Sequence, residues 1–352
     1  MTWTKEMPAR PVVAVAGATG AVGVEFLQVL HDLDFPASEV RALASARSVG
    51  KKLAFAGCGD VPAGELTVQE MTPESFQGVD IALFSCGADL SKKMRQAVVD
   101  AGAVMIDNSS AFRMDEDVPL VVPEVNPGDL AWHSGVIANP NCSTIQMVVA
   151  LKPLHDLARI KRVVVSTYQA ASGAGAPAMR ELYDQTREYL GGTPDDQLTV
   201  EAFQHRIAFN CIPHIDKFFD DGSTKEEWKM VVETKKIMGD EGIKVAATCV
   251  RVPVLRCHGE AVNVEFDSDV TPEQARAALA AAPGVTVMDD PATNVYPMPG
   301  LLAGTDDTYV GRIRRDESVE HGLAFWVVAD QIRKGAALNA VQIAQLLVPS
   351  AS

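Results

Sequence analysis

The sequence reads Gly17-Ala18-Thr19-Gly20-Ala21-Val22-Gly23 between a short apolar strand, residues 12–16, and an amphipathic helix that extends to about Leu33. Glycines with this spacing let the backbone turn sharply and approach a pyrophosphate, whose charge is then held by the first N–H groups of the helix. A strand before the glycines and a helix after them is the context that this motif requires. The stretch therefore predicts a dinucleotide-binding βα turn, with an ordinary tight turn as the alternative.

The next predicted strand, residues 40–44, ends in Ser45-Ala46-Arg47-Ser48. In NAD-specific sites an acidic residue near this strand end binds the ribose 2′-hydroxyl, whereas an arginine accommodates the 2′-phosphate of NADP. This segment contains no acidic residue. Arg47 and its flanking hydroxyls therefore favour NADP over NAD, and a solvated basic turn that includes Lys51 and Lys52 is the alternative.

Further strands are predicted at residues 81–85 and 104–107, with a helix over 91–101 between them. This alternation is typical of a parallel, doubly wound sheet. The second strand runs into the polar stretch Asp107-Asn108-Ser109-Ser110-Ala111-Phe112-Arg113. Ligands bind beyond the carboxyl ends of such strands, so Arg113 is a candidate anion ligand. A surface ion pair with Asp115 or Glu116 is the alternative.

A cysteine stands in Asn139-Pro140-Asn141-Cys142-Ser143-Thr144-Ile145, between a turn and an apolar run, residues 145–151, that predicts a helix. The unpaired N–H groups and the positive dipole end at a helix start favour a thiolate. The thiolate is the reactive form of cysteine. Together with a nicotinamide cofactor, it favours the interconversion of an aldehyde and an activated acyl group through a thioester.

After Cys142 the pattern changes to predicted strands at 162–169, 244–254 and 260–266, helices at 178–190 and 225–238, and irregular sequence at 191–222. Long alternating strands indicate a second, mostly antiparallel sheet. The last helix, residues 332–348, is expected to pack on the first domain. The predicted α/β fold thus has a Rossmann NADP-binding domain, residues 1–141 with 332–352, and an α+β catalytic and dimerisation domain, residues 142–331.

The composition is that of a soluble globular protein, with 352 residues, 47% hydrophobic and 22% charged. A net charge of −15 argues against nucleic-acid or anionic-membrane partners, and any anionic substrate must be held by local arginines. No signal peptide or membrane-length apolar run is evident, so a cytoplasmic location is expected. The six cysteines lack C-x-x-C spacing and indicate neither a metal site nor a disulfide framework.

Arg251 and His258 flank a predicted strand end or bend that contains Pro253. A histidine whose pKa is near neutrality is a natural base for a thiol or an attacking oxyacid. A structural histidine fits as well, and because the chain has seven histidines the residues alone do not select His258.

The sequence resembles the aspartate-β-semialdehyde dehydrogenase family nearly from end to end. The resemblance rests on the order and spacing of several segments: the glycine turn, Ser45-Ala46-Arg47-Ser48, 108–113, 121–126, Pro140-Asn141-Cys142-Ser143-Thr144, 166–175, 226–229, 251–258 and 338–342. It implies an NADP-dependent, reversible reduction of 4-phospho-L-aspartate to L-aspartate 4-semialdehyde in the biosynthesis of lysine, diaminopimelate, threonine and methionine. It also implies a homodimer, or possibly a tetramer, that uses aspartyl phosphate, aspartate semialdehyde and phosphate as substrates.

By this resemblance, Cys142 is the nucleophile, His258 the acid/base, and Gln169 orients the substrate and the thioester. The implied substrate residues are Arg113 and Lys229 for phosphate, Arg251 and Glu226 for the carboxylate and ammonium, and Asn141. The implied cofactor residues are Gly17, Thr19, Gly20, Ala21, Val22, Gly23, Ser45, Arg47, Ser48, Ser172, Gly173 and Asn339. Gly259 stands where relatives more often carry serine, which bears on the orientation of His258.

Three alternatives are open. An N-acetyl-glutamyl-phosphate reductase performs the analogous reduction, but Glu226 favours an aspartyl substrate. A glyceraldehyde-phosphate-type dehydrogenase would be expected to prefer NAD, and Arg47 argues against that preference. A catalytically silent binding paralogue is disfavoured because cysteine, glutamine, arginine and histidine occur together.

Overall fold

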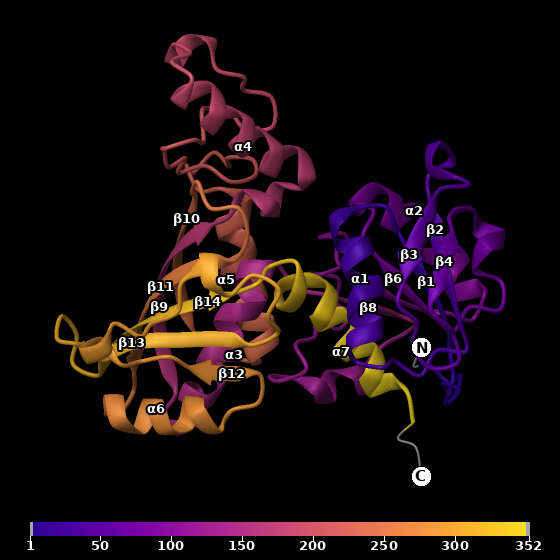
Figure 1. Cartoon of the computed structure of the whole chain (residues 1–352). Helices are drawn as coiled ribbons and strands as arrows, with labels where there is room; N and C mark the ends of the chain where they lie inside the picture. The colour runs from indigo at the N-terminus through magenta and orange to yellow at the C-terminus, as the bar shows by residue number, and fades with distance from the viewer. Residues whose placement is uncertain (1–2, 350–352) are drawn as a thin grey trace. The chain divides into compact units, whose positions relative to one another are not determined.

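The chain forms two compact units in the computed structural model, which describes residues 3–349 (Figure 1). The first unit contains the chain up to Asn141 and the segment from Ala336 onward. The second unit is Cys142–Gly335. The polypeptide therefore passes between the units twice, and the nucleophile candidate Cys142 is the first residue of the second unit.

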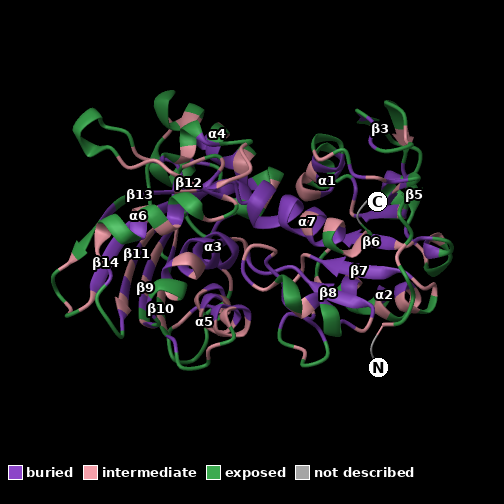
Figure 2. Ribbon diagram, turned by 90° about the horizontal axis from the view of Figure 1, so that it is seen from below, coloured by how far each residue is buried: buried purple, intermediate pink, exposed green. Residues whose placement is uncertain are grey.

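The first unit is built on a six-stranded sheet in the order β5-β2-β1-β6-β7-β8, in which every neighbouring pair is parallel. This confirms the predicted doubly wound parallel sheet. The strands are buried along β6, β7 and β8, as the colours of Figure 2 show. The bounds are β1 Val12–Ala16, β2 Glu39–Ala44, β5 Gln69–Glu70, β6 Ile81–Phe84, β7 Val104–Asp107 and β8 Val136–Ala138, with a separate hairpin of β3 Lys52–Phe55 and β4 Gly64–Thr67.

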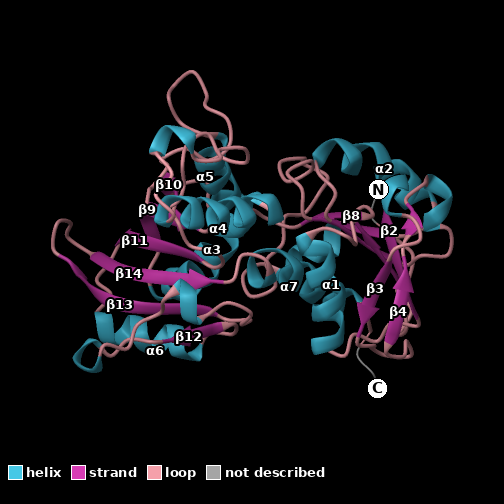
Figure 3. Ribbon diagram, turned by 45° about the horizontal axis from the view of Figure 1, so that its top comes forward, coloured by secondary structure: helices cyan, strands magenta, loops and turns pink. Residues whose placement is uncertain are grey.

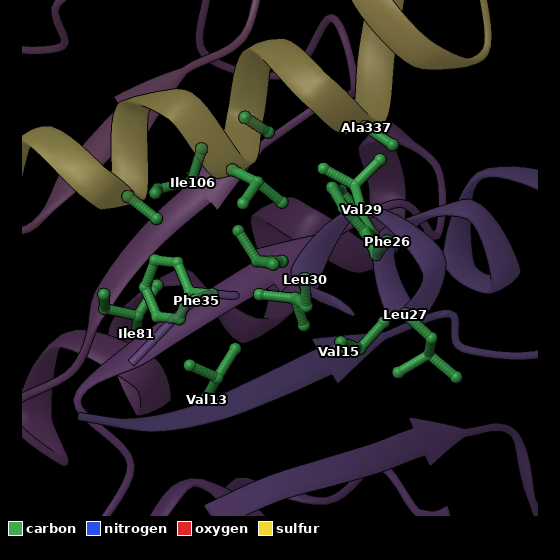
Figure 4. Close-up of a cluster of buried hydrophobic side chains, with 14 of the residues drawn as sticks. Val13, Val15, Phe26, Leu27, Val29, Leu30, Phe35, Ile81, Ile106 and Ala337 are labelled. Atoms are coloured by element: carbon green, nitrogen blue, oxygen red, sulfur yellow. The ribbon is translucent and has the colours of Figure 1, made fainter. Parts of the chain in front are cut away.

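The hydrophobic core of this unit combines the sheet with α1 (Ala21–Asp32) and α7 (Leu338–Leu347), while α2 (Ala88–Asp100) contacts β7. Figure 4 shows side chains such as Phe26, Leu30 and Ile106 meeting beneath the C-terminal segment. Each of these three is fully buried. Burial of one such side chain contributes about 1.5–3 kcal/mol, so α7 is an integral part of the first unit.

The second unit contains a six-stranded mixed sheet in the order β10-β9-β11-β14-β13-β12. The three central pairings are antiparallel, as predicted, and the outermost pair at each edge is parallel. The bounds are β9 Ile160–Gln169, β10 Lys244–Arg251, β11 His258–Phe266, β12 Val285–Val287, β13 Thr308–Asp316 and β14 Gly322–Ala329.

Three helices pack on one face of this sheet: α3 (Cys142–Leu157), α5 (Lys225–Met238) and α6 (Pro272–Ala281) (Figure 3). Helix α5 begins with a capping box in which Thr224 accepts from the Glu227 N–H and Glu227 accepts from the Thr224 N–H. Helix α4 (Ala176–Leu190) precedes the irregular stretch and packs with it in a smaller apolar cluster. No helix among residues 3–349 is both long and apolar enough to cross a membrane.

The predicted C-terminal helix differs from the observed one at its start. Residues Arg333–Ala337 form a π-helical turn, and the α-helix begins only at Leu338. Single π turns inside helices are frequent at functional sites. This turn holds Gly335 close to Cys142, as described below.

Candidate active site

Cys142 is the first residue of α3, as the apolar run after it predicts. The first turn of this helix contains no acidic side chain, so nothing there opposes the positive end of the helix dipole. The thiol is partly exposed, whereas the neighbouring side chains Ser143 and Thr144 are buried. The nucleophile candidate is therefore accessible and sits where a thiolate is stabilised.

Gly335 lies directly against this cysteine. A Cβ atom on Gly335 would be 2.9 Å from the Cβ of Cys142 and 3.2 Å from its Cα, which is closer than side chains tolerate. The π-helical turn that contains Gly335 thus forms one wall beside the nucleophile. No sequence motif indicated a role for this glycine.

The backbone of Ala170 connects Arg251 with His258. The Arg251 Nη1 donates to the Ala170 carbonyl oxygen at 2.7 Å, and the Ala170 N–H donates to Nδ1 of His258 at 3.0 Å. Gly173 fills the remaining space, because a Cβ there would be 2.8 Å from Arg251 Nη1 and 3.2 Å from His258 Nε2. The strand ends of β10, β9 and β11 therefore bring these residues together.

The hydrogen bond from Ala170 defines the protonation of His258. Because Nδ1 accepts that bond, a neutral ring carries its hydrogen on Nε2. Nε2 has no hydrogen-bond partner among residues 3–349, and the side chain is fully buried. Burial and then the charge of Arg251 hold the His258 pKa well below its usual value. The ring is therefore neutral near pH 7, with one N–H free for a ligand.

A second polar group of the site consists of Gln169, Glu226 and Lys229. The Gln169 amide donates to Glu226 Oε1 at 3.2 Å, and the Lys229 ammonium contacts Glu226 Oε2 at 3.0 Å and Asp216 Oδ2 at 2.7 Å. Burial lowers the Lys229 pKa, but the charge of Glu226 and the contacts with Asp216 outweigh it, so the pKa is raised. Lys229 is thus a firmly charged cation, and a substrate ammonium at Glu226 would share that carboxylate with it.

The charge of Arg251 is affected by the charges of Cys142 and Glu226. Burial lowers the pKa of Arg251, and the negative charges of Cys142 and Glu226 oppose this change. The charge of Arg251 is therefore coupled to those of Cys142 and Glu226. An arginine there can pair with a substrate carboxylate in bidentate geometry.

Gln331 connects two loops of this site. Its amide nitrogen donates to the Ser172 hydroxyl, and its oxygen accepts from the Cys257 N–H at 2.8 Å. Ser172 and Gly173 lie in the short 3-10 turn after β9, and Cys257 precedes His258. Gln331 was not predicted from the sequence, in which its position just after an apolar strand is the one signal that could have indicated it.

In the first unit, the glycine turn has the geometry that close backbone approach requires. Gly17 has φ +88, and a Cβ on it would be 2.3 Å from the Ser85 carbonyl oxygen. A Cβ on Gly23 would be 2.1 Å from the Gly17 oxygen. Gly20 caps α1 without any side-chain hydrogen bond. Thr19 and Gly20 are exposed, and Ala21 and Val22 are half-buried, so the helix N–H groups can receive a phosphate.

Arg47 lies in a 3-10 turn after β2, the strand next to β1. Its side chain and that of Ser45 are exposed, whereas Ser48 is buried. The exposed guanidinium is therefore placed beside the end of the strand that carries the glycine turn, as an NADP-binding arginine would be.

Arg113 is buried rather than at the surface. Its guanidinium donates to the carbonyl oxygens of Asn139 at 2.9 Å and Asn108 at 2.7 Å. Asp115, two residues further along the chain, forms an ion pair with Arg95. Arg113 is thus fixed by backbone carbonyls close in the chain to Asn141, which is also buried.

Asn339 is fully buried in α7, where its amide nitrogen donates to the Val121 oxygen at 3.0 Å and to Asn139 Oδ1 at 2.7 Å. These contacts tie α7 to the segment that leads to Cys142. Contact of Asn339 with a cofactor stays a prediction.

The predicted residues thus fall into two sets. The second unit contains Cys142, Gln169, Ser172, Gly173, Glu226, Lys229, Arg251 and His258. The first unit contains the glycine turn, Ser45, Arg47, Ser48, Arg113, Asn141 and Asn339. One set is suited to acyl chemistry on a cysteine and the other to dinucleotide binding.

Comparison with known proteins gives the same division. Residues 12–133 match the semialdehyde dehydrogenase NAD-binding domain, and residues 151–334 match the semialdehyde dehydrogenase dimerisation domain. The chain is 57% identical over 339 residues to the aspartate-semialdehyde dehydrogenase of Aquifex aeolicus, covering 96% of this chain and 97% of that protein.

Two solved structures are informative. Aspartate-semialdehyde dehydrogenase II of Vibrio cholerae, complexed with ASA, is similar with a TM-score of 0.92 and 47% identity, over 97% of this chain and 99% of that one. The aspartate-semialdehyde dehydrogenase of Candida albicans, solved with NADP, has a TM-score of 0.71 and 27% identity, over 96% of this chain and 98% of that one.

Proposed function

The chain belongs to the aspartate-semialdehyde dehydrogenase family, and from this membership we propose that it reduces 4-phospho-L-aspartate reversibly to L-aspartate 4-semialdehyde. The product is a precursor of lysine, diaminopimelate, threonine and methionine. The observation that carries the proposal is the partly exposed Cys142 at the start of α3, in the same unit as Arg251 and His258. Near-complete coverage of relatives with this one activity favours it over the acetyl-glutamyl, glyceraldehyde and silent alternatives.

The residues present fit NADP. The missing side chains of Gly17 and Gly23 leave the backbone open, and the uncapped start of α1 offers N–H groups to a pyrophosphate. Arg47 supplies a guanidinium for the 2′-phosphate. Ser172 and Gly173 are proposed to contact the nicotinamide end. When bound, the reduced cofactor supplies the hydride of the reaction.

Cys142 carries the covalent chemistry. Its thiolate forms a bond to the acyl carbon of the aspartyl phosphate. The bond between this carbon and the phosphate oxygen then breaks, phosphate leaves, and the acyl group remains on the Cys142 sulfur as a thioester. After hydride transfer to the thioester carbon, the thiohemiacetal collapses to the aldehyde and releases the Cys142 thiolate. Both tetrahedral oxyanions can accept from the Cys142 N–H and from the Nε2–H of His258.

His258 is proposed as the acid/base that exchanges a proton with the phosphate oxygen. Its neutral ring presents Nε2–H, as the hydrogen bond from Ala170 to Nδ1 requires. A charged ring would need Nδ1 to release that N–H, because Nδ1 would then be a donor. Proton exchange at His258 is therefore coupled to a movement of the Ala170 peptide.

The remaining residues position the substrate. We propose that Arg251 pairs with the α-carboxylate, that Glu226 accepts from the ammonium, and that Gln169, held by Glu226, orients the thioester. Lys229 and Arg113 are proposed to bind phosphate, with Asn141 beside the nucleophile. The functional assembly is a homodimer through the unit that matches a dimerisation domain, and a tetramer would be a dimer of such dimers.

The test is an NADP-dependent and phosphate-dependent assay with aspartate semialdehyde. Cys142→Ala should abolish turnover, whereas Cys211→Ala is the matched control, because Cys211 is the more exposed thiol yet lies outside the site. A thiol reagent at stoichiometric dose should label Cys142 first. Turnover by the Cys142→Ala variant, or its absence in the unmodified protein, would refute the proposal.

A further inference from the structure

Glu260 is a buried carboxyl group that the reaction described above does not use. It lies two residues after His258 on β11 and therefore points to the same side of the sheet. The side chain is fully buried, and neither carboxyl oxygen has a hydrogen-bond partner among residues 3–349. An ionised carboxylate in such a place would be very costly, so the group must be neutral or paired.

Gln146 is the polar side chain that faces Glu260 from α3. It lies one helical turn after Cys142 and is fully buried. Its Nε2 lies 3.5 Å from the His258 carbonyl oxygen, to which it donates, and its Oε1 has no partner among residues 3–349. Its contact with His258 places Gln146 beside the start of β11, two residues from Glu260, and Gln146 partly offsets the effect of burial on the Glu260 pKa. The Gln146 Oε1 atom, an acceptor without a donor among residues 3–349, and the buried Glu260 carboxyl group therefore lie in the same region of the core.

We propose that Glu260 is a protonated positioning residue, whose O–H donates to Gln146 Oε1 and so holds Gln146 against the carbonyl oxygen of His258. A single proton then satisfies Gln146 Oε1 and one oxygen of Glu260 together. The chain of contacts runs from Glu260 through Gln146 to His258. It connects Gln146, one turn into α3, with the start of β11. The position of Cys142 on α3 is thereby fixed relative to His258 on β11.

The surroundings of Glu260 favour the protonated form. Its neighbours across the sheet are Thr167 on β9 and Val327 on β14, neither of which is charged. On β10 the titratable group beside Thr167 is Cys249, whose thiol pKa is raised chiefly by burial and further by the charge of Glu226. His258 on the same strand is held neutral. Burial raises the Glu260 pKa well above its ordinary value.

The inference rests on the proposed function for its kinetic test. Glu260→Gln keeps a donor for Gln146 Oε1, whereas Glu260→Leu has a similar size and no donor. We expect Glu260→Leu to lower kcat about 10- to 100-fold through misalignment of Cys142 and His258, with the KM for semialdehyde unchanged, and Glu260→Gln to retain kcat. Thr308→Val is the matched control, because the buried Thr308 hydroxyl on β13 of the same sheet also has no hydrogen-bond partner within residues 3–349.

A second test does not depend on turnover. A carboxyl group whose pKa is raised in the folded state stabilises the fold most at low pH, and this contribution is lost as the pH rises from the ordinary value toward the raised one. Glu260→Gln should therefore raise the melting temperature relative to the unmodified protein, and the difference should grow from about pH 5 upward. A difference that is constant with pH would overturn the protonated assignment.

The partnership itself is tested by a double-mutant cycle. Gln146→Leu and Glu260→Leu each leave one polar group unmatched, whereas the double variant leaves neither. The double variant should melt at a higher temperature than the sum of the two single effects predicts. Additive effects would overturn the proposed contact, and equal kcat losses in the Glu260→Gln and Glu260→Leu variants would overturn the positioning role. An inactive unmodified protein would refute the proposed function but leave both stability tests decisive.

Discussion

The imidazole of His258 is defined by a single backbone hydrogen bond, from the Ala170 N–H to Nδ1. Burial and the neighbouring Arg251 lower its pKa well below the usual value. The arrangement in which Nδ1 accepts from Ala170 and Nε2–H faces the ligand is lost when the ring is protonated, as the pH falls through the pKa of His258. We therefore expect the acid limb of kcat/KM to lie well below pH 6.5, the usual value for histidine.

The measurement is a pH profile of kcat/KM for aspartate semialdehyde. His258→Asn should remove this acid limb and lower kcat by about 10²- to 10⁴-fold, with little change in the affinity for NADP. Asparagine retains one side-chain N–H for the oxyanion but has no group that titrates in this range. A loss that appears only in NADP binding would show that His258 has another role.

Arg47 gives a residue-scale prediction for the first unit. The exposed guanidinium should form a charge-assisted contact with the 2′-phosphate of NADP. Arg47→Ala should weaken NADP about 10- to 150-fold, the worth of one such contact, and leave NAD nearly unchanged. Titration of both cofactors by fluorescence checks this, with Lys51→Ala as the matched basic control. Equal losses for both cofactors would mean that Arg47 supports the loop.

The predictability of the site differs from residue to residue. The glycine turn and Cys142 could be found from sequence because their chemistry requires a local context, a strand or a helix start, that the pattern reveals. His258 could not be selected from seven histidines without the family resemblance. Gln331, Gly335, Gln146 and Glu260 escaped altogether, since their roles depend on neighbours that are far away in the chain.

At the scale of elements, the π-helical turn Arg333–Ala337 places a glycine against the nucleophile. A methyl group on Gly335 would overlap Cys142, and overpacking of this kind costs roughly 1–3 kcal/mol. We expect Gly335→Ala to shift Cys142 and lower kcat about 10-fold or more. Gly300→Ala is the control, because nothing lies within 4 Å of its added Cβ. Unchanged kcat in Gly335→Ala would mean that the turn relaxes without moving the cysteine.

The strands show where a periodic pattern fails. The predicted bounds of β1, β7 and α5 agree with the structure, because the two strands are short apolar runs and the charged helix has a capping box at its start and Gly239 at its end. No strand was predicted for β13, where a register shift follows Gly311 and Arg312 has a positive φ, so the alternation is broken. The strand β14 is apolar without interruption, and such a run cannot be distinguished from a buried helix by periodicity.

At the scale of the whole molecule, the second unit offers one sheet face that the helices α3, α5 and α6 do not cover. The family match describes this part of the chain as a dimerisation domain. We expect a dimer in sedimentation equilibrium at micromolar concentration, and a melting temperature that rises with protein concentration, as mass action requires. A monomer whose melting temperature does not depend on concentration would contradict the proposed assembly.

The first unit is made from two separated pieces of chain, since α7 completes its core after the whole second unit has been passed. During translation, the strands of the parallel sheet emerge from the ribosome long before α7. Until α7 has been made, the apolar side chains that it contacts around Phe26 and Leu30 stay exposed to solvent. Domains that are continuous in sequence can fold as soon as they emerge. The core of this unit can be completed only after the second unit and α7 have been translated, so we expect the nascent chain to bind chaperones until α7 has emerged.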